Sequence, residues 1–318
     1  MILFLMIDGV GIGSRDPGRN PLARRPTLLS HFDDGGGSAL PRGGRVTAVD
    51  ATLGVPGRPQ SATGHTTLLT GVNAARYLGR HLLGFPNAEL RELLTRKNLF
   101  LDLARQGRRG TFANAYRAAY LDALGLPHRG SGNEEPPLPV PTRVLRPAAS
   151  TVAYGTLGLP FRTLEDLREG TALYHDITSE QPRKAGCEVP KRSPREAAEI
   201  LLELARGVDL AFFEHFRTDE VGHARDFEAA SEVLEILDEF LHRLVEGLRE
   251  DEALVVTSDH GNLEDLSLRQ HTLNPVPVLG FGRAAPLVDR LRSLLDVHPA
   301  LLALSRAAVA RESRNASH

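Results

Sequence analysis

Cysteine is nearly absent from this chain of 318 residues, in which Cys187 is the one example. A single thiol excludes both a disulfide framework and a metal site built from several thiolates. The chain does contain twelve histidines and 40 aspartates and glutamates. Any metal ion that this protein binds must therefore be held by imidazole and carboxylate groups.

A charge excess of one sign and a long apolar run are also missing. The formal net charge is −2, which gives no general indication of a nucleic-acid or membrane partner. The apolar run at 1–7 meets Asp8 at once and has no basic stretch before it, unlike a signal peptide. No segment reaches the roughly 18 apolar residues of a membrane-spanning helix. We therefore expect a cytoplasmic protein with neither nucleic acid nor membrane as a partner.

Short apolar runs separated by helical patterns predict the fold class. The runs that we expect to form strands buried on both faces are Ile2–Ile7, Val208–Phe213, Leu254–Thr257 and Val276–Phe281. Helical periodicity lies between them, most clearly over Phe227–Leu248. This alternation predicts an α/β protein with a doubly wound, mostly parallel sheet.

The middle of the chain differs in composition from both ends. Residues 127–142 are rich in proline and glycine, which argues against a regular element there. Because the expected strands lie on both sides, we predict a discontinuous core from 1–85 and 193–318, with a smaller α+β cap domain inserted at 86–192. Ser193, Pro194 and Glu196 fit the N-cap, N1 and N3 positions of a helix that re-enters the core.

Four segments place acidic, hydroxyl or imidazole groups after a strand or at a turn into a helix. They are Met6–Gly11, Gln60–Thr67, Thr218–His223, and Thr257–Asn262 followed by His271–Pro277. Taken singly, each fits a simple turn, a helix cap or a partly buried histidine. Taken together, they matter because a doubly wound sheet gathers its strand ends along one edge. The side chains that we expect to meet there are Asp8, Asp219, Asp259, His223, His260 and His271.

This set of side chains predicts a metal centre. Carboxylates and imidazoles without thiolates suit Mn²⁺ or Zn²⁺ and disfavour a structural zinc site. Six such ligands exceed what one tetrahedral ion needs, so we expect two divalent ions about 4 Å apart, as in two-metal phosphoryl-transfer sites. Hydroxyls near the expected helix start at Ser61 would face a phosphate.

The order of these motifs resembles the alkaline phosphatase superfamily. The closest branch is that of cofactor-independent phosphoglycerate mutase and phosphopentomutase, on the strength of Asp-Gly, Ser-x-x-Gly-His, Asp-x-Val-Gly-His, Asp-His-Gly-Asn and His-Thr-x-Asn-Pro-Val-Pro. The resemblance implies Ser61 as the nucleophile, with Thr63 and Thr66 as alternatives if the register slips. It implies one metal ion on Asp219, His223 and His271, and a second ion on Asp8, Ser61, Asp259 and His260.

The resemblance also implies a metal-dependent phosphoryl-transfer enzyme. The leading hypothesis is a mutase-like protein acting on a small phosphorylated metabolite, such as a phosphoglycerate or a sugar phosphate. The alternatives are a phosphatase or phosphodiesterase on the same core, and a metal-binding protein without turnover. Motifs of both mutases are mixed in this chain, so neither named activity carries over. Arginines of the insert are more typical of solvated surface than of a phosphate clamp, namely Arg129, Arg143, Arg146 and Arg162.

Overall fold

A six-stranded sheet forms the centre of the molecule. The computed structural model describes residues 1–130, 135–136, 138, 141 and 145–315, with side chains up to residue 306. The strand order across the sheet is β2-β8-β7-β1-β6-β3. The strands are β1 (Ile2–Ile7), β2 (Arg45–Val49), β3 (Gly110–Phe112), β6 (Leu210–His215), β7 (Ala253–Thr257) and β8 (Val276–Gly282).

Most of the sheet is parallel, as the sequence predicts, and β8 is the exception. β1 pairs in parallel with both β6 and β7, and β3 pairs in parallel with β6. β8 runs antiparallel to β7 and to β2. An antiparallel neighbour needs no crossover helix, and among the described residues no helix lies between β7 and β8. The expectation of a mostly parallel α/β sheet is confirmed, with one strand reversed.

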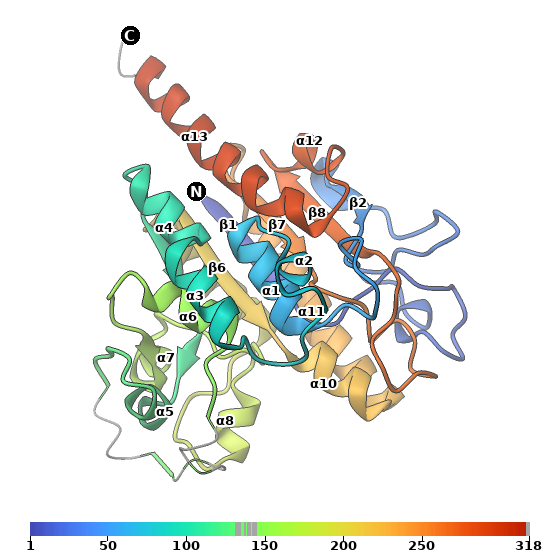
Figure 1. Ribbon diagram of the computed structural model, residues 1–318, viewed down its shortest axis with the longest axis horizontal. Helices are drawn as coiled ribbons and strands as arrows, with labels where there is room; N and C mark the ends of the chain where they lie inside the picture. Colours follow the sequence, from blue (N-terminus) through green and yellow to red (C-terminus); the bar gives the residue numbers. More distant parts are fainter. Residues whose placement is uncertain (131–134, 137, 139–140, 142–144, 316–318) are drawn as a thin grey trace.

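Helices cover both faces of this sheet, and this explains the continuous apolar runs of its strands. Leu3, Leu5 and Ile7 share one core with α9 (Pro194–Arg206) and α11 (Phe227–Gly247). The alternate residues of β1 share a second core, on the other face, with α1 (Ser61–Thr70), α4 (Leu99–Arg105) and α13 (Val297–Asn315). Figure 1 shows α1, α4 and α13 in front of the sheet.

The start of α9 has the predicted capping box. The Ser193 hydroxyl accepts from the Glu196 backbone at 3.2 Å, and the Glu196 carboxylate accepts from the Ser193 backbone at 2.8 Å. Other short helices are α2 (Ala74–Leu78), α3 (Ala88–Arg96), α10 (Arg217–Ala224) and α12 (Ala285–Val288), with 3-10 turns at Pro21–Ala23, Pro41–Gly43 and Leu294–Asp296. No helix formed by the described residues is long and apolar enough to cross a bilayer.

The segment at 86–192 contributes to two sheets. Its strand β3 extends the central sheet. A separate two-stranded sheet pairs β4 (Ala115–Tyr116) with β5 (Arg162–Thr163). Around it lie α5 (Ala118–Ala123), α6 (Ala149–Gly155), α7 (Leu164–Glu169) and α8 (Glu180–Lys184), away from α12 and α13 in Figure 1. The division into a core and an inserted cap domain stays a prediction.

Candidate metal centre

Three acidic side chains meet at the edge of the sheet where the parallel strands end. Asp8 follows β1 directly, Asp259 lies two residues after β7, and Asp219 lies on α10 after β6. The turn after β1 needs a glycine, because Gly9 has a φ of 72° and a Cβ there would lie 2.6 Å from the Asp219 carboxylate. The fold thus brings residues more than 200 positions apart into one small volume.

Asp219, His223 and His271 form the first group of candidate ligands. Asp219 and His223 lie one turn apart on α10, with Oδ2 and Nε2 separated by 3.3 Å. The Nε2 atom of His271 lies 3.1 Å from that of His223 and 3.7 Å from Asp219 Oδ1. The other ring nitrogen of His271 lies 2.9 Å from the Pro59 carbonyl, which fixes the orientation of the ring.

Ser61, His260, Asp8 and Asp259 form the second group. The Ser61 hydroxyl lies 2.9 Å from Nε2 of His260. The same nitrogen lies 3.3 Å from Oδ1 of Asp8 and 3.3 Å from Oδ2 of Asp259. Burial lowers the pKa of His260 to about 4, so its ring is neutral at pH 7. A neutral imidazole is the form that binds a metal ion.

His65 belongs to this cluster and was not assigned a role from the sequence. It lies one helical turn after Ser61 on α1, and its Nε2 atom is 3.0 Å from Asp259 Oδ2 and 3.7 Å from Asp8 Oδ2. The four-residue spacing between Ser61 and His65 is the sequence signal that could have found it.

The ligand atoms also permit a different grouping of the same side chains. Those of Asp8, His65 and Asp259 lie within 4.8 Å of one another, and so do those of Asp219, His260 and His271. His260 therefore lies within reach of both groups. The structure brings all seven predicted ligands together, and it adds His65.

The chemistry of the cluster fits divalent cations. Burial, together with the negative charges of Asp259 and Asp219, raises the pKa of Asp8 well above its usual range. Oδ1 of Asp8, Oδ2 of Asp259 and Nε2 of His65 are buried, and none has a well-aligned hydrogen bond among the described residues. Unsatisfied buried polar atoms are costly. Buried oxygen and nitrogen atoms that lie close together without a well-aligned hydrogen bond are expected where an ion occupies the space between them.

Glu264 holds the loops of this centre in place. Its carboxylate is buried and accepts from the backbone of Gly11 at 2.8 Å, from the backbone of Asn262 at 2.8 Å and from the Asn274 side chain at 3.0 Å. The Thr272 hydroxyl is a fourth donor. One carboxylate thus joins the turn after β1 to both parts of the loop between β7 and β8. Glu264 was not among the residues predicted from the sequence.

Ser61 is the hydroxyl that faces open space. It lines a cavity of about 660 Å³ together with Asp8, His65 and Asp219. The hydroxyls of Thr63 and Thr66 instead donate to backbone carbonyls of Gln60 and Ala62, at 3.0 and 2.6 Å. These contacts favour Ser61 over the two threonines as the reactive hydroxyl.

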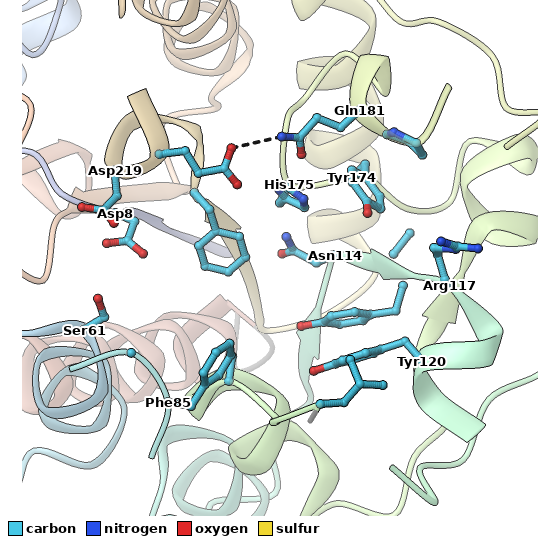
Figure 2. A pocket seen from close by; sticks show the side chains of 18 of the residues that line it. Asp8, Ser61, Phe85, Asn114, Arg117, Tyr120, Tyr174, His175, Gln181 and Asp219 are labelled. Carbon is cyan, nitrogen blue, oxygen red and sulfur yellow. Dashed lines mark hydrogen bonds between the residues drawn. The ribbon is translucent and has the colours of Figure 1, made fainter. Parts of the chain in front are cut away.

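The cavity extends from the acidic cluster to the segment at 114–185. Figure 2 shows Ser61, Asp8 and Asp219 at one side and Arg117 and Tyr120 at the other. Of the four arginines considered from the sequence, Arg143 lies outside the described residues, and the other three are not part of the lining. Arg162 instead donates to Thr111 and to the Phe112 carbonyl. Arg117 is the arginine that reaches this cavity.

Comparison with known proteins gives a partial match in sequence. The model of the Metalloenzyme superfamily matches residues 177–304. A 2,3-bisphosphoglycerate-independent phosphoglycerate mutase of Desulforudis audaxviator is 37% identical over 123 residues, which cover 36% of this chain and 24% of that protein. The enzyme of the same name from Ruegeria pomeroyi is 36% identical over 124 residues, or 25% of its length. The match thus spans about a quarter of these curated relatives.

Solved structures share the fold over nearly the whole chain. The PH0037 protein from Pyrococcus horikoshii is 17% identical, with a TM-score of 0.52 and 96% of each chain covered. Thermus thermophilus alkaline phosphatase is 14% identical, with a TM-score of 0.53, and 96% of this chain and 90% of that one are covered. At such identities the likeness is one of architecture.

Proposed function

Because this chain belongs to the metalloenzyme superfamily, which includes the alkaline phosphatases, we propose that it transfers phosphoryl groups through Ser61 at a centre of two divalent metal ions. The observation that carries this proposal is the position of the Ser61 hydroxyl. It lies at the first residue of α1, beside His260, between the acidic cluster and the cavity. Amide groups at a helix N-terminus favour a phosphate.

We assign the two ions as the resemblance implies. Asp219, His223 and His271 would hold one ion, and Asp8, Ser61, Asp259 and His260 the other, with Mn²⁺ or Zn²⁺ as the candidates. Divalent ions in such a site lower the pKa of a bound hydroxyl and neutralise phosphate charge. His65 faces the carboxylates of Asp8 and Asp259 and would keep both in position.

The transfer has two chemical parts. In the first, a bond forms between Ser61 Oγ and phosphorus while the ester P–O bond breaks, and the alcohol leaves with a proton. In the second, the phosphoserine passes its phosphoryl group to an acceptor, and Ser61 regains its proton. A different hydroxyl of the bound product as acceptor makes the protein a mutase, and water makes it a phosphatase.

Each outcome has a supporting observation. The mutase is supported by the curated relatives, which are named phosphoglycerate mutases and match this chain over about a quarter of their length. It is also supported by the described residues between Asn114 and Ala185 that line the far side of the cavity and would retain an intermediate. The phosphatase is supported by the alanine and aromatic side chains that make up much of that far side, since they offer a polar intermediate fewer partners than Asn114, Arg117 and Gln181 beside them.

The test is to trap the phosphoserine. The metal-loaded protein is incubated with a panel of phosphate esters, and the peptide that contains Ser61 is analysed by mass spectrometry. We expect phosphate on Ser61, and a loss of turnover of at least about a thousandfold in Ser61→Ala. Ser231→Ala, an exposed serine of α11, is the matched control. Full turnover in Ser61→Ala would show that Ser61 is not the nucleophile.

Product analysis then separates the outcomes. Free phosphate indicates hydrolysis, whereas an isomeric ester indicates a mutase. Bound metal without turnover on any ester would identify a metal-binding protein.

A further inference from the structure

We infer that the substrate is a phosphate monoester whose alcohol half carries a flat, apolar ring. The inference rests on the proposed phosphoryl transfer at Ser61 and concerns the part of the cavity beyond it. It narrows the substrate away from the phosphoglycerate or sugar phosphate expected from the sequence. A ring alcohol with a single hydroxyl also leaves water as the acceptor, which favours the phosphatase.

Two tyrosines form an aromatic wall in the cavity. The rings of Tyr116 and Tyr120 are stacked, with centroids 5.4 Å apart and an angle of 14° between their planes. The hydroxyl of Tyr116 lies 2.9 Å from that of Thr151, and the hydroxyl of Tyr120 donates to the Arg146 carbonyl at 3.1 Å. Tyr116 also packs against Phe112 and Phe161, so Tyr120 is the member of the pair with more ring surface left for a ligand, and its hydroxyl already has a partner.

Phe85 adds a third ring, on the Ser61 side of the cavity. It lines the cavity and is 55% exposed, which is unusual for a large apolar side chain. No ring contact involves Phe85 among the residues that the structure describes. Figure 2 places it between Ser61 and Tyr120. An exposed ring that faces a cavity indicates a binding surface rather than core packing.

Small side chains leave room between these rings. Ala115, Ala148, Ala149 and Ala185 line the cavity, and Phe216 and Tyr174 complete its apolar surface. The volume of about 660 Å³ is within the range of sites that bury a small molecule. A phosphate at Ser61 with a ring beyond it would use this shape.

The charge of the far side argues against a second anionic group on the substrate. Arg117 is the one arginine among the described lining residues, and no lysine accompanies it. Its Nε atom lies 3.8 Å from Oε2 of Glu135, so that carboxylate is the nearby counter-charge, although Nε and Nη2 of Arg117 are buried without a hydrogen-bond partner among the described residues. The carboxylate of a phosphoglycerate would have to share this one cation with Glu135, and a charge that is buried without a full partner is unfavourable.

Two esters of equal intrinsic reactivity test the inference. Phenethyl phosphate and glycerol phosphate are both esters of primary alcohols, and they differ in whether the alcohol carries a ring or hydroxyls. For the metal-loaded protein we expect kcat/KM to be at least about tenfold higher for phenethyl phosphate, since burial of a ring stabilises the complex. Equal or higher values for glycerol phosphate or phosphoglycerate would overturn the inference.

Phe85→Ala tests the aromatic surface directly. We expect it to lower the ratio of the two kcat/KM values about fivefold, mainly through KM. Leu83→Ala is the matched control, because Leu83 is 69% exposed in the same loop and does not line the cavity. An unchanged ratio in Phe85→Ala would count against the inference.

A binding measurement separates this inference from the proposed function. Phenylpropylphosphonate and propylphosphonate cannot transfer their phosphorus group, and their binding to the wild-type, metal-loaded protein is followed by calorimetry. We expect at least about tenfold tighter binding of the phenyl compound, with a more negative heat-capacity change. If the phenyl compound binds more tightly but no phosphoserine forms, the ring site is supported and the proposed function is wrong. If phosphoserine forms but the phenyl compound binds no more tightly, the proposed function is supported and the ring inference is wrong.

Discussion

Two buried histidines and one half-buried histidine outside the candidate ligand set share one electrostatic property. Burial lowers the pKa of His175 to about 3, and the pKa values of His215 and His298 to about 4. All three are therefore mostly neutral in the folded protein from about pH 5 to pH 7, whereas an unfolded histidine binds a proton below about pH 6.5. Unfolding then takes up protons, so stability is lost as the pH falls from about 6.5 towards 4.

His298→Asn isolates one of these contributions far from the metal centre. The drop in the free energy of unfolding from pH 7 to pH 5 should be smaller in this variant than in wild type by about 1 kcal/mol. Urea unfolding at the two pH values measures this difference. His242→Asn, at an exposed position of α11, is the control and should leave the drop as it is in wild type. An identical drop in all three proteins would contradict the assignment.

At the residue scale, site residues that directly follow a strand were easier to predict from the sequence than site residues whose contacts depend on how a helix packs. Asp8 and Asp259 follow apolar runs, and the parallel sheet brings them together. The contact of His65 with Asp259 depends on how α1 is rotated against the sheet. Glu264 depends on four donors from three separate stretches of chain. No local pattern encodes contacts of this kind.

Among the elements, the loop at 258–275 has the largest part in the site. It leaves β7 with Asp259 and His260, is held by Glu264, and returns through His271 into β8. The reversed direction of β8 follows from this path, since the loop starts and ends at the same edge of the sheet. Candidate ligands of both groups therefore lie on one element.

Glu264→Gln should loosen this loop without removing a ligand. An amide has one acceptor oxygen and no charge, so it cannot serve all four donors, and we expect affinity for Mn²⁺ to fall about tenfold or more. Calorimetric titration with Mn²⁺ measures the change, with Glu250→Gln at the exposed turn before β7 as control. Affinity equal to wild type would show that Glu264 does not position the centre.

Strand prediction succeeded where apolar runs were continuous. The four expected strands match β1, β6, β7 and β8 within two residues at each end. β2 and β3 were not predicted, because β2 is largely exposed or half-buried and β3 has only three residues. The sequence pattern could not predict the direction of β8, because a strand buried on both faces has the same apolar pattern in either direction.

For the whole molecule, the candidate metal centre joins distant parts of the chain. Asp8, Ser61, Asp219 and His271 come from four separate segments. An ion that binds the folded state alone stabilises it by about 2.7 kcal/mol at a hundred times its dissociation constant. Removal of metal by a chelator should therefore lower the unfolding temperature by several degrees. Calorimetric scans with chelator, and after Mn²⁺ is restored, measure this effect. An unfolding temperature that stays the same with chelator and after Mn²⁺ is restored would argue against bound ions.

The central position of β1 has a consequence for synthesis of the chain. Its two partners in the sheet begin at Leu210 and Ala253, about 200 residues or more after β1 ends at Ile7. At a synthesis rate of roughly 5–20 residues per second, this apolar strand has no partner for at least about 10 to 40 s. During that time it is the kind of segment that pairs with other chains. Residues 2–7 therefore become fully paired in the sheet only after β6 and β7 have been made.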